Sequence, residues 1–374
     1  MYNMKKIVVA FDSFKGSLSS VEAAEAFVSG FREVCPDTES HIVAISDGGE
    51  GMAEAVVYAL GGDMVAAKTH DPLGREITAS YGVIDEGATA VISIASASGL
   101  TLLHHEERNP LIASTYGTGE LLLDAVRRGC RRVVVGLGGS ATNDGGVGML
   151  RALGYKFLDA EGKELISTID ILERVESIIA PKVNPFRGIE LSVAVDVNNP
   201  LCGESGASMV YGAQKGATMD MMQRLDRGLA HYASVVAKWR GADYSALSGM
   251  GAAGGLGFAF GAVLGAMPQS GIELMLSIAN FDALAKDASL IITGEGRIDR
   301  QTVMGKAPAG VLRHAKSLGV RCIAIGGSVE WCDELMASDF DAIYAITPKD
   351  MPLEEAMRSD TARENMRATA KMIV

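Results

Sequence analysis

The sequence has few cysteines, an excess of acidic over basic residues and no long hydrophobic run. Its five cysteines are odd in number and include no C-x-x-C pair, which argues against a disulfide framework or a zinc site and favours free thiols in a reducing compartment. The 34 Lys and Arg residues against 46 Asp and Glu residues give a formal charge of −12. Because nucleic acids and acidic membranes bind basic surfaces, this balance argues against both. A small anionic ligand would need a local cluster of Lys and Arg, or a metal ion.

A membrane-spanning helix takes roughly 20 apolar residues. The most membrane-like segment, residues 255–266, is far shorter, and its glycines at 257, 261 and 265 lie four apart, as in closely packed helices. The first residues, MYNMKKIVVAF, hold an apolar run too short for the core of a signal peptide, and DSFK follows at once. We therefore expect a cytoplasmic protein that binds neither membranes nor nucleic acid.

Short β-branched runs recur along the 374 residues, which exceed the length at which a single core usually stops growing. Each run is followed by a polar or glycine-rich loop, and most then by a helix-like stretch: KKIVVAF, HIVAI, RRVVVGL, SLIIT and RCIAI. This pattern is typical of buried parallel strands joined by crossover helices. EITASYGVI and ATAVISIA alternate more strongly and flank DEG, which predicts an antiparallel hairpin. The expectation is an α/β protein of two domains, one of them inserted.

Helices are expected where amphipathic stretches follow capping residues. The expected ranges are 19–34 with Ser19 or Ser20 as N-cap, 218–240 with Thr218 as N-cap, and 50–60, 117–129, 307–318 and 353–373. In such folds ligands bind at the carboxyl ends of the strands, where the glycine-rich loops lie.

The loop GGSATNDGG, residues 138–146, follows the apolar run VVVGL directly. Glycine at this density usually brings backbone N–H groups close to a ligand or permits positive φ, so we expect an anion site. One interpretation is a dinucleotide fingerprint, because Gly136–Ala141 matches G-x-G-x-x-A and Asp159 ends the next candidate strand. That motif needs a helix that begins at the glycines. Residues 142–146 are poor helix formers, so we expect the helix to start near Gly145, after a longer loop.

Polar and charged residues follow several of the expected strands. Phosphoryl transfer needs cations, carboxylates that hold Mg²⁺ and backbone donors, and the sequence supplies each class. A single Lys or Asp in a loop is usually a solvated residue, and Asp, Asn and Gly also serve turns, but the same pattern at five strand ends favours a functional cluster. Neither a GxxxxGK[ST] P-loop nor the motif set of protein kinases is present. The residues concerned are Asp12, Lys15, Asp47, Glu50, Asn143, Asp144, Asp196, Asn198, Asn199, Lys215, Glu295, Arg297, Asp299 and Lys306.

Several longer motifs occur in order along the chain: FDSFKGSLS, SDGGEG, TYGTGEL, GLGGSATNDGGVGM, VDVNNPLCGESGAS, YGAQKGA, GAAGGLG, ITGEGRIDRQT and GKAPAGV. Through them nearly the whole chain resembles the bacterial glycerate kinase family. The resemblance implies transfer of phosphate from ATP, with Mg²⁺, to D-glycerate, usually giving 2-phosphoglycerate, by a monomer or homodimer. It also implies a flavodoxin- or Rossmann-like parallel-sheet domain, here 1–65 and 286–374, and a second α/β domain with a mixed sheet, here 66–285.

The chemistry of this reaction suggests roles for the residues. Arg297 is the first choice for the carboxylate of glycerate, since a guanidinium group binds carboxylates bidentately, and Ser17 and Asp299 would join it. Lys15 and Lys215 would contact the ATP phosphates or the transferring phosphoryl group. Asp47 or Asp196 would be the general base, the other being left for Mg²⁺. The nucleotide would be held by Gly138, Gly139, Ser140, Thr142 and Asn143, with Asp144 and Glu295 as metal ligands.

The chain differs from the family's usual motifs at a few positions. Phe11 precedes Asp12 where the family has proline, and ISIASASGL places Ser93 and Ser96 where acidic residues are frequent. A missing carboxylate at Ser93 removes a possible metal ligand or hydrogen-bond acceptor for the substrate. A kinase for a related hydroxy acid is therefore the first alternative, and a nucleotide- or metabolite-binding protein without turnover is the second.

Overall fold

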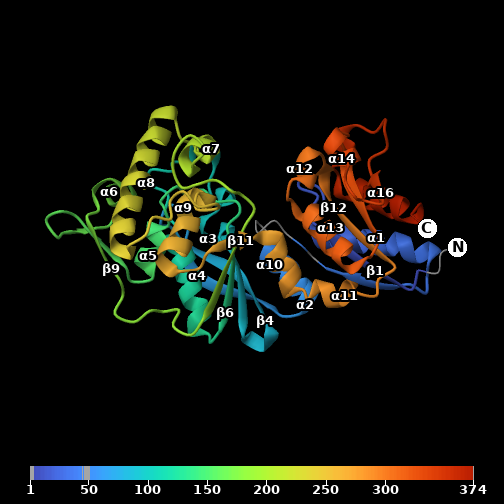
Figure 1. Ribbon diagram of the computed structural model, residues 1–374, viewed down its shortest axis with the longest axis horizontal. Coiled ribbons are helices and arrows are strands. Elements are labelled where there is room, and N and C mark those ends of the chain that lie inside the picture. Colours follow the sequence, from blue (N-terminus) through green and yellow to red (C-terminus); the bar gives the residue numbers. More distant parts are fainter. Residues whose placement is uncertain (1–3, 44, 46–50, 374) are drawn as a thin grey trace. The chain divides into compact units, whose positions relative to one another are not determined.

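The computed structural model of the protein (Figure 1) describes residues 4–43, 45 and 51–373, so the predicted site residues Asp47 and Glu50 lie outside the described residues. The chain forms two compact units. Unit 1 comprises Met1–Asp47, Tyr58–Leu60 and Ile272–Val374, and unit 2 comprises Gly48–Val57 and Gly61–Gly271. The domain boundaries expected from the sequence, at 65/66 and 285/286, stay a prediction.

Unit 1 is built on a five-stranded sheet in the order β14–β13–β12–β1–β2, with every neighbouring pair parallel. Counted within this unit, the order is 2-1-3-4-5, that of flavodoxin-like folds. The neighbours β1 and β12 flank the point where the chain changes direction across the sheet, and ligands of such folds bind beyond the carboxyl ends of the strands there. The strands are β1 (Lys6–Phe11), β2 (Glu39–Ile42), β12 (Leu290–Ile298), β13 (Cys322–Val329) and β14 (Ala342–Ala345).

Helices cover both faces of this sheet, because successive side chains of a strand point to opposite faces. Ile7 and Val9 pack in the core that includes residues of α1 and α16, whereas Val8 packs in the core that includes residues of α10, α11 and α13. Ser19, one of the two N-cap candidates, caps α1, and Glu22 closes a capping box with it. The helices are α1 (Ser20–Val34), α10 (Gly271–Ile278), α11 (Phe281–Ala285), α12 (Arg300–Val303), α13 (Ala307–Leu318), α14 (Asp333–Met336), α15 (Leu353–Ala356) and α16 (Ser359–Lys371). The expected helix 353–373 is thus interrupted between α15 and α16.

Unit 2 holds a six-stranded mixed sheet in the order β11–β10–β6–β5–β4–β3 and a small antiparallel sheet in the order β8–β7–β9. Strands β5, β6, β10 and β11 run parallel, and β4 is antiparallel to both β3 and β5. The hairpin expected around DEG is therefore confirmed, as is the mixed sheet. The strands are β3 (Asp63–His70), β4 (Glu76–Ile84), β5 (Thr89–Ser93), β6 (Arg132–Gly136), β7 (Lys156–Leu158), β8 (Glu164–Leu165), β9 (Ser177–Ile179), β10 (Glu190–Val195) and β11 (Pro268–Ser270).

The long helix α8 begins after Thr218, whose side chain accepts a hydrogen bond from the backbone of Met221, so this predicted N-cap is confirmed. The glycine-rich segment after residue 250 begins with positive φ values and continues from α9 into a π-helical turn, Ala259–Leu264. The other helices, of which α2 spans the boundary between the units, are α2 (Met52–Leu60), α3 (Ala95–Ser98), α4 (Tyr116–Arg127), α5 (Val147–Ala152), α6 (Thr168–Arg174), α7 (Ala207–Tyr211), α8 (Met219–Arg240) and α9 (Ala252–Phe258).

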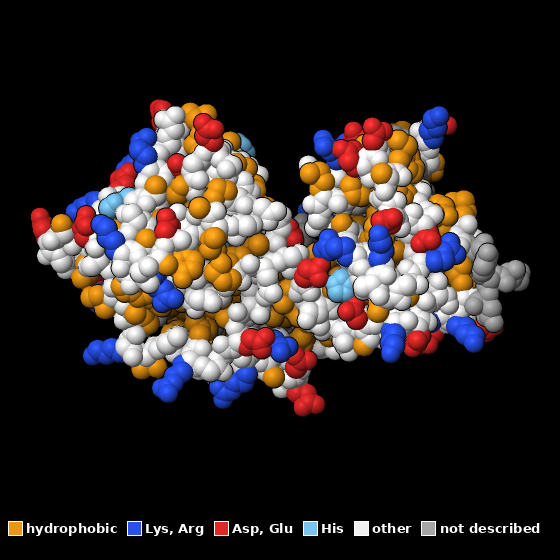
Figure 2. All heavy atoms as spheres, in the orientation of Figure 1, with side chains coloured by type: hydrophobic (Ala, Val, Ile, Leu, Met, Phe, Trp, Pro, Cys, Tyr) orange, Lys and Arg blue, Asp and Glu red, His pale blue; other side chains and the backbone are white. Residues whose placement is uncertain are grey.

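The composition of the chain is reflected in its helices, its surface and its cysteines. Across the described ranges, no helix combines the length and apolar character needed to cross a membrane. On the face that Figure 2 shows, Lys and Arg side chains are interspersed with Asp and Glu side chains rather than gathered into one basic surface. All five cysteines are free thiols.

Candidate functional site

The loop GGSATNDGG leaves the carboxyl end of β6 and stays irregular until α5 begins at Val147, after Gly146 as its N-cap. The helix therefore starts well after the first glycines, as expected, and a helix N-terminus at these glycines, which a dinucleotide fingerprint requires, is absent from this loop. Asp159 follows β7 of the small antiparallel sheet and accepts hydrogen bonds from the backbone of Glu161 and Lys163. The dinucleotide interpretation is wrong, because neither of its two parts has the required place in the fold.

A buried lysine contacts this loop. The side chain of Lys215 is 2% exposed, and its Nζ donates hydrogen bonds to Ser140 Oγ and to the carbonyl oxygen of Thr142, both at 2.7 Å. The next residue, Gly216, has φ +87°, and a Cβ at this position would lie 2.3 Å from the carbonyl oxygen of Arg108. Only glycine permits this turn, and the turn brings the ammonium group to the loop.

Lys215 and the first residues of the loop line a pocket of about 150 Å³. Gly138, Gly139 and Ser140 belong to this lining, so backbone groups of the glycine segment border the same space as Lys215. Gly139 has φ +72°, a conformation that few other residues adopt. The pocket is smaller than the pockets that hold whole drug-sized ligands, and its size suits a single phosphate group. The apolar part of the lining comes from Leu100, Leu137, Val197 and Ala253.

Burial changes the protonation of the lysine in this pocket. It lowers the pKa of Lys215 from the usual 10.5 to about 7, and the negative charge of Asp144 opposes this change. Lys215 is therefore only partly protonated at neutral pH. An anion in the pocket would favour the protonated form, so binding of a phosphate group and uptake of a proton are coupled here.

The middle of the loop is turned into the protein. Thr142, Asn143 and Asp144 are all 0% exposed. Asn143 Nδ2 donates to Ser208 Oγ at 2.7 Å, but within the described chain Asn143 Oδ1 and Thr142 Oγ1 have no hydrogen-bond partner. Buried polar atoms are nearly always paired, so these two atoms are candidates for bonds to a substrate hydroxyl or to water.

Asp144 differs from its neighbours, because its carboxylate is fully engaged. It accepts hydrogen bonds from Thr115, Gly146 and Gly148. Sequence reasoning missed Thr115 as well as Ser208, the partner of Asn143. Both belong to motifs that carried the resemblance, Thr115 as the first residue of TYGTGEL and Ser208 as the last of VDVNNPLCGESGAS.

The strand next to β6 contributes to the same edge of the sheet. Asp196 is the first residue after β10 and is exposed. Asn199 accepts a hydrogen bond from the hydroxyl of Tyr211 at 2.7 Å and donates to the carbonyl oxygen of Ser205 at 2.7 Å. Since Tyr211 lines the pocket, Asn199 fixes one of its walls. The neighbouring residue Asn198 accepts a hydrogen bond from Ser248.

Ser93, the residue that replaces the usual carboxylate, is the last residue of β5 and is 3% exposed. It lies opposite Gly136 in the register with β6, directly before the glycine loop. The departure from the family therefore falls at the carboxyl edge of the sheet that carries the pocket.

The remaining predicted residues that the structure describes lie in unit 1, so the structure divides the predicted cluster between two sheets. The loop after β1 runs beside β12, where the backbone N–H of Asp12 donates to the carbonyl oxygen of Gly294 at 2.9 Å. Asp12 is buried and Lys15 is exposed, and the hydroxyl of Ser17 is buried without a hydrogen-bond partner within the described chain.

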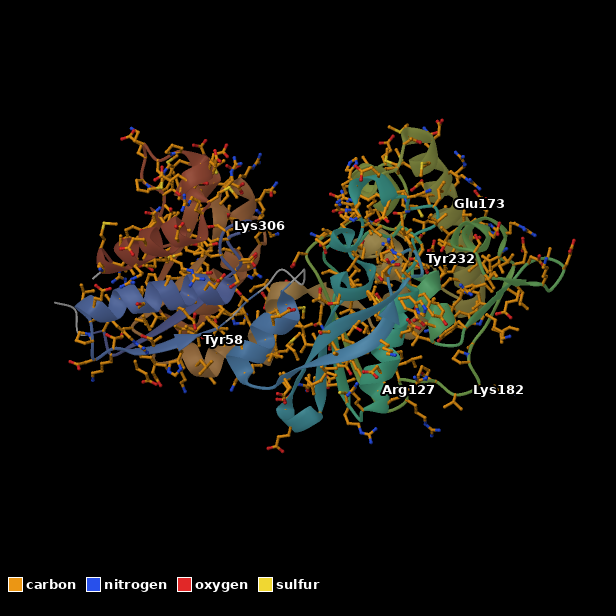
Figure 3. All side chains as sticks on the ribbon, turned by 180° about the vertical axis from the view of Figure 1, so that it is seen from behind. Tyr58, Arg127, Glu173, Lys182, Tyr232 and Lys306 are labelled. Atoms are coloured by element: carbon orange, nitrogen blue, oxygen red, sulfur yellow. The ribbon has the colours of Figure 1, made fainter. Side chains whose placement is uncertain are left out.

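The segment GEGRID is strand for most of its length, because β12 continues to Ile298 and pairs with β13. The expectation of a loop directly after SLIIT is therefore wrong. Glu295 is 8% exposed and accepts a hydrogen bond from Thr302 Oγ1 at 2.6 Å. The Nζ of Lys306, labelled in Figure 3, lies 3.6 Å from Oε2 of Glu295. Burial raises the pKa of Glu295, and the Thr302 hydroxyl and Lys306 oppose this change.

Two charged residues at the end of β12 have partners close by. Asp299 is the N-cap of α12 and accepts a hydrogen bond from the backbone of Gln301 at 2.8 Å. Arg297 is exposed and forms ion pairs with Asp299, at 3.6 Å, and with Glu330. The guanidinium group is thus accessible, and carboxylates already hold it at the carboxyl end of the sheet.

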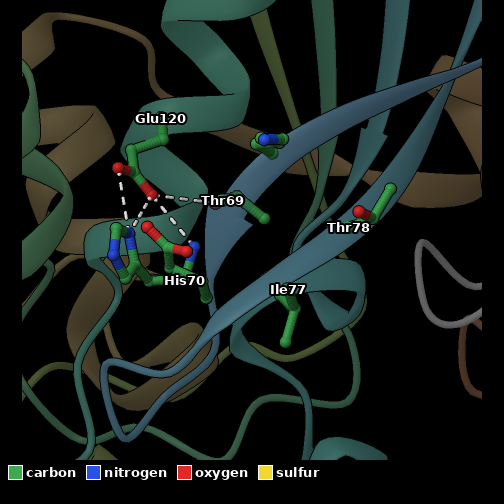
Figure 4. Close-up of a pocket in the computed structure, with 7 residues that line it drawn as sticks. Thr69, His70, Ile77, Thr78 and Glu120 are labelled. Atoms are coloured by element: carbon green, nitrogen blue, oxygen red, sulfur yellow. Dashed lines mark hydrogen bonds and ion pairs between the residues drawn. The ribbon is translucent and has the colours of Figure 1, made fainter.

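A larger pocket, about 430 Å³, lies on the hairpin β3–β4 beside α4 (Figure 4). Glu120, from the motif TYGTGEL, accepts hydrogen bonds from Thr69 Oγ1 and from the backbone of His70, both at 3.0 Å, and its Oε2 lies 2.9 Å from His70 Nδ1. These groups satisfy one another, and the lysine of the lining, Lys68, is exposed. The pocket of Lys215 is therefore the better anion site.

Among the residues that the structure describes, no group of three or more His, Cys, Asp or Glu side chains is placed to hold a metal ion. A preformed cage for a cation is thus absent from this part of the chain.

Comparison with known proteins agrees with this geometry. A model of the glycerate kinase family matches residues 7–374. The chain belongs to the glycerate kinase family. It is 44% identical to a glycerate kinase of Halalkalibacterium halodurans over 95% of this chain and 94% of that one, and 43% identical to a glycerate 2-kinase of Escherichia coli over 94% and 93%. A solved Salmonella typhimurium LT2 structure named glycerate kinase 2 is 42% identical, with a TM-score of 0.88 over 99% of this chain and 97% of that one.

Membership of the glycerate kinase family makes the protein a kinase, an enzyme that transfers phosphate from ATP to a small molecule. This confirms the resemblance drawn from the motifs. The roles of individual residues stay predictions.

Proposed function

We propose that the protein transfers the γ-phosphate of MgATP to a hydroxyl of D-glycerate and gives 2-phosphoglycerate. The observation that carries the proposal is the pocket where buried Lys215 and the segment Gly138–Ser140 meet, in a chain similar from end to end to glycerate kinases. An ammonium group and backbone N–H groups are the donors that a transferring phosphoryl group requires.

In unit 2, Lys215 with Gly138, Gly139 and Ser140 would bind a phosphate of ATP. Thr142 Oγ1 and Asn143 Oδ1, which have no partner within the described chain, would bond to a hydroxyl of the acceptor or to a water molecule that it orders. We keep Asp196 as a candidate general base, because it is exposed and directly follows a strand of this edge. Asp47 is the other candidate.

In unit 1, Arg297 would bind the carboxylate of glycerate by exchanging its exposed partner Glu330 for the substrate. Lys15 and Ser17, after β1, and Asp299, at the end of β12, would complete the contacts at the carboxyl ends of these neighbouring strands.

Mg²⁺ takes most of its ligands from substrate phosphates and water, with one or two protein carboxylates. The described residues fit this mode, since they offer single carboxylates rather than a cage. The candidate ligand is Glu295 in unit 1, or Asp196 in unit 2 if Asp47 is the base, whereas the buried carboxylate of Asp144 already accepts four hydrogen bonds. When bound, the ion would neutralise charge on the phosphates.

The test is an assay that couples ADP release to MgATP and D-glycerate, with ³¹P NMR of the product. The expected product is 2-phosphoglycerate, and 3-phosphoglycerate would contradict the assigned hydroxyl. Turnover only with another short hydroxy acid would favour the second candidate function, a kinase for a related acid, for which buried Ser93 at the edge of β5 is the supporting observation. ATP binding without any turnover would favour a binding protein.

We further propose that the enzyme works in the cytoplasm, where ATP is available, as a monomer or homodimer. Elution volume with light scattering tests the second part, and a larger assembly would contradict it.

A further inference from the structure

Asp144 lies where the glycine loop meets α4, and donors of the chain fill its carboxylate. Oδ2 accepts hydrogen bonds from the backbone N–H and the hydroxyl of Thr115, both at 2.8 Å, and from Gly148 N–H at 3.2 Å. Oδ1 accepts one from Gly146 N–H at 3.0 Å. An ionised carboxylate has about four such acceptor positions, and the residue is 0% exposed. A metal ion would have to displace these donors.

We propose that Asp144 is a positioning residue, which fastens the glycine loop to the start of α4 and places its negative charge in the same buried region as Lys215, rather than a ligand of Mg²⁺. The inference rests on the proposed function, because it assigns this pocket to a phosphate of ATP.

The hydrogen bonds of Asp144 and Thr115 connect the glycine loop to two helices. Thr115 is the N-cap of α4, and its hydroxyl, while donating to Asp144, also accepts a hydrogen bond from the backbone of Met149 in α5 at 2.9 Å. A carboxylate at a helix N-terminus is stabilised by the helix dipole. The segment from Ser140 to Thr142, which contacts Lys215, is therefore anchored on its far side by Asp144.

The charge of Asp144 matters because Lys215 is buried. Among the residues that the structure describes, the Arg108 guanidinium donates to the carbonyl oxygen of Gln214, and the hydroxyls of Tyr211 and Tyr232 stay protonated because burial raises their pKa values. The charge of Asp144 raises the pKa of Lys215 against the effect of burial. Burial also raises the pKa of Asp144, and the hydrogen bonds from Thr115, Gly146 and Gly148 oppose this change because they favour the charged carboxylate. Without the charge of Asp144, the amine of Lys215 would lose its proton at a lower pH and attract a phosphate anion less.

The first variant is Asp144→Asn, which keeps the shape of the side chain and removes its charge. We expect the affinity for ATP, measured by calorimetry with and without Mg²⁺, to fall roughly tenfold at pH 7.5 in both cases, as for the loss of hydrogen bonds to a charged group. The pH above which affinity declines should move to a lower value than in the wild type, and the Mg²⁺ concentration for half-maximal activity should stay within about twofold.

Asp159→Asn is the matched control. Asp159 is also nearly buried, at 7% exposure, and also accepts backbone hydrogen bonds, from Glu161 and Lys163, but in the small sheet. This variant should bind ATP like the wild type with the same pH dependence. An equal loss in both variants would overturn the proposal, because it would reflect general destabilisation.

The second test variant is Thr115→Val, which removes the hydroxyl bonds to Asp144 and Met149 but leaves the charge of Asp144 in place. We expect a loss of ATP affinity of a few fold with an unchanged pH midpoint. Wild-type affinity in this variant would overturn the fastening part of the inference.

Two outcomes would overturn the other parts of the inference, namely that Asp144 does not bind Mg²⁺ and that its charge acts on Lys215. A large rise in the Mg²⁺ requirement of Asp144→Asn with normal binding of metal-free ATP would make Asp144 a metal ligand. Should that variant fail to fold, NMR titration of Lys215 in the wild type, with ¹³C-methylated lysines and Lys215→Arg for assignment, tests the charge: a pKa of about 5–6, typical of a buried lysine without a negative charge beside it, would contradict it. A wild type that binds ATP without phosphorylating glycerate would sink the proposed function and leave this inference standing.

Discussion

Lys215→Met is expected to stabilise unit 2 and abolish phosphoryl transfer. Burial lowers the pKa of Lys215 from 10.5 to about 7, and at about 1.36 kcal/mol per pKa unit this difference of about 3.5 corresponds to a folding cost of about 5 kcal/mol for the charged side chain. Methionine has a similar length and no charge. The variant also loses the hydrogen bonds to Ser140 and Thr142, which lowers its stability by about 1–3 kcal/mol. The net gain in the free energy of unfolding is therefore about 2–4 kcal/mol.

The sign of the pH dependence follows from the lowered pKa. Between about pH 7 and 10.5 the unfolded chain keeps the proton on Lys215 and the folded chain does not. Because the unfolded state then binds more protons, wild-type stability rises with pH across this window. The advantage of the methionine variant is therefore largest below pH 7 and shrinks toward pH 9.

The assay is calorimetric unfolding of both proteins at pH 6.5 and pH 9, with Lys215→Arg as the control that keeps the charge. For a unit of this size each kcal/mol raises Tm by about 2–4 °C, so the variant should unfold several degrees higher at pH 6.5. A Tm at or below that of the wild type at pH 6.5, or a difference that does not change with pH, would refute the reasoning that Lys215 is a buried and strained cation.

Three further changes have distinct expected results. Gly254→Ala should lower Tm and weaken ATP binding, because the new Cβ would lie 2.1 Å from the carbonyl oxygen of Thr142. Gly241→Ala is the control: its φ is similar but the space around it is open, so it should cost only about 1 kcal/mol of stability and leave binding intact. Equal effects of the two substitutions in thermal unfolding would contradict this. His314→Gln should reduce the free energy of unfolding by on the order of 1 kcal/mol at pH 6 and by less at pH 8.5. Burial lowers the His314 pKa, but hydrogen bonds to two carboxylates outweigh this effect and raise it, so the stability from the charged imidazole is lost as pH rises through the folded pKa. A loss that grows with pH in urea titrations would overturn the assignment. Arg297→Ala should raise KM for glycerate far more than KM for ATP in steady-state kinetics, and an unchanged KM for glycerate would remove Arg297 from the carboxylate site.

Local patterns predicted the elements well where neighbouring residues decide the conformation. The N-cap of α1 at Ser19, one of two candidates, the N-cap Thr218 and the late start of α5 all depend on contacts within a few residues. The run GEGRID was the exception. Its glycines and charged residues suggest a loop, yet pairing with β13 keeps it extended as far as Ile298. Neighbouring residues do not indicate this pairing, because β13 lies further along the chain.

The sequence by itself determined the α/β class, several of the strands, the N-cap Thr218, the glycine loop and the family, because each depends on spacing or on motifs that can be read in order. The tertiary structure alone decided which predicted residues meet. Lys215 reaches Ser140 across 75 positions of the chain, Asp144 is filled by donors of Thr115 rather than left open, and the strand-end residues divide between two sheets. The physical reason is burial: a residue's charge, pKa and available lone pairs depend on which distant groups exclude water around it, and no local pattern encodes them.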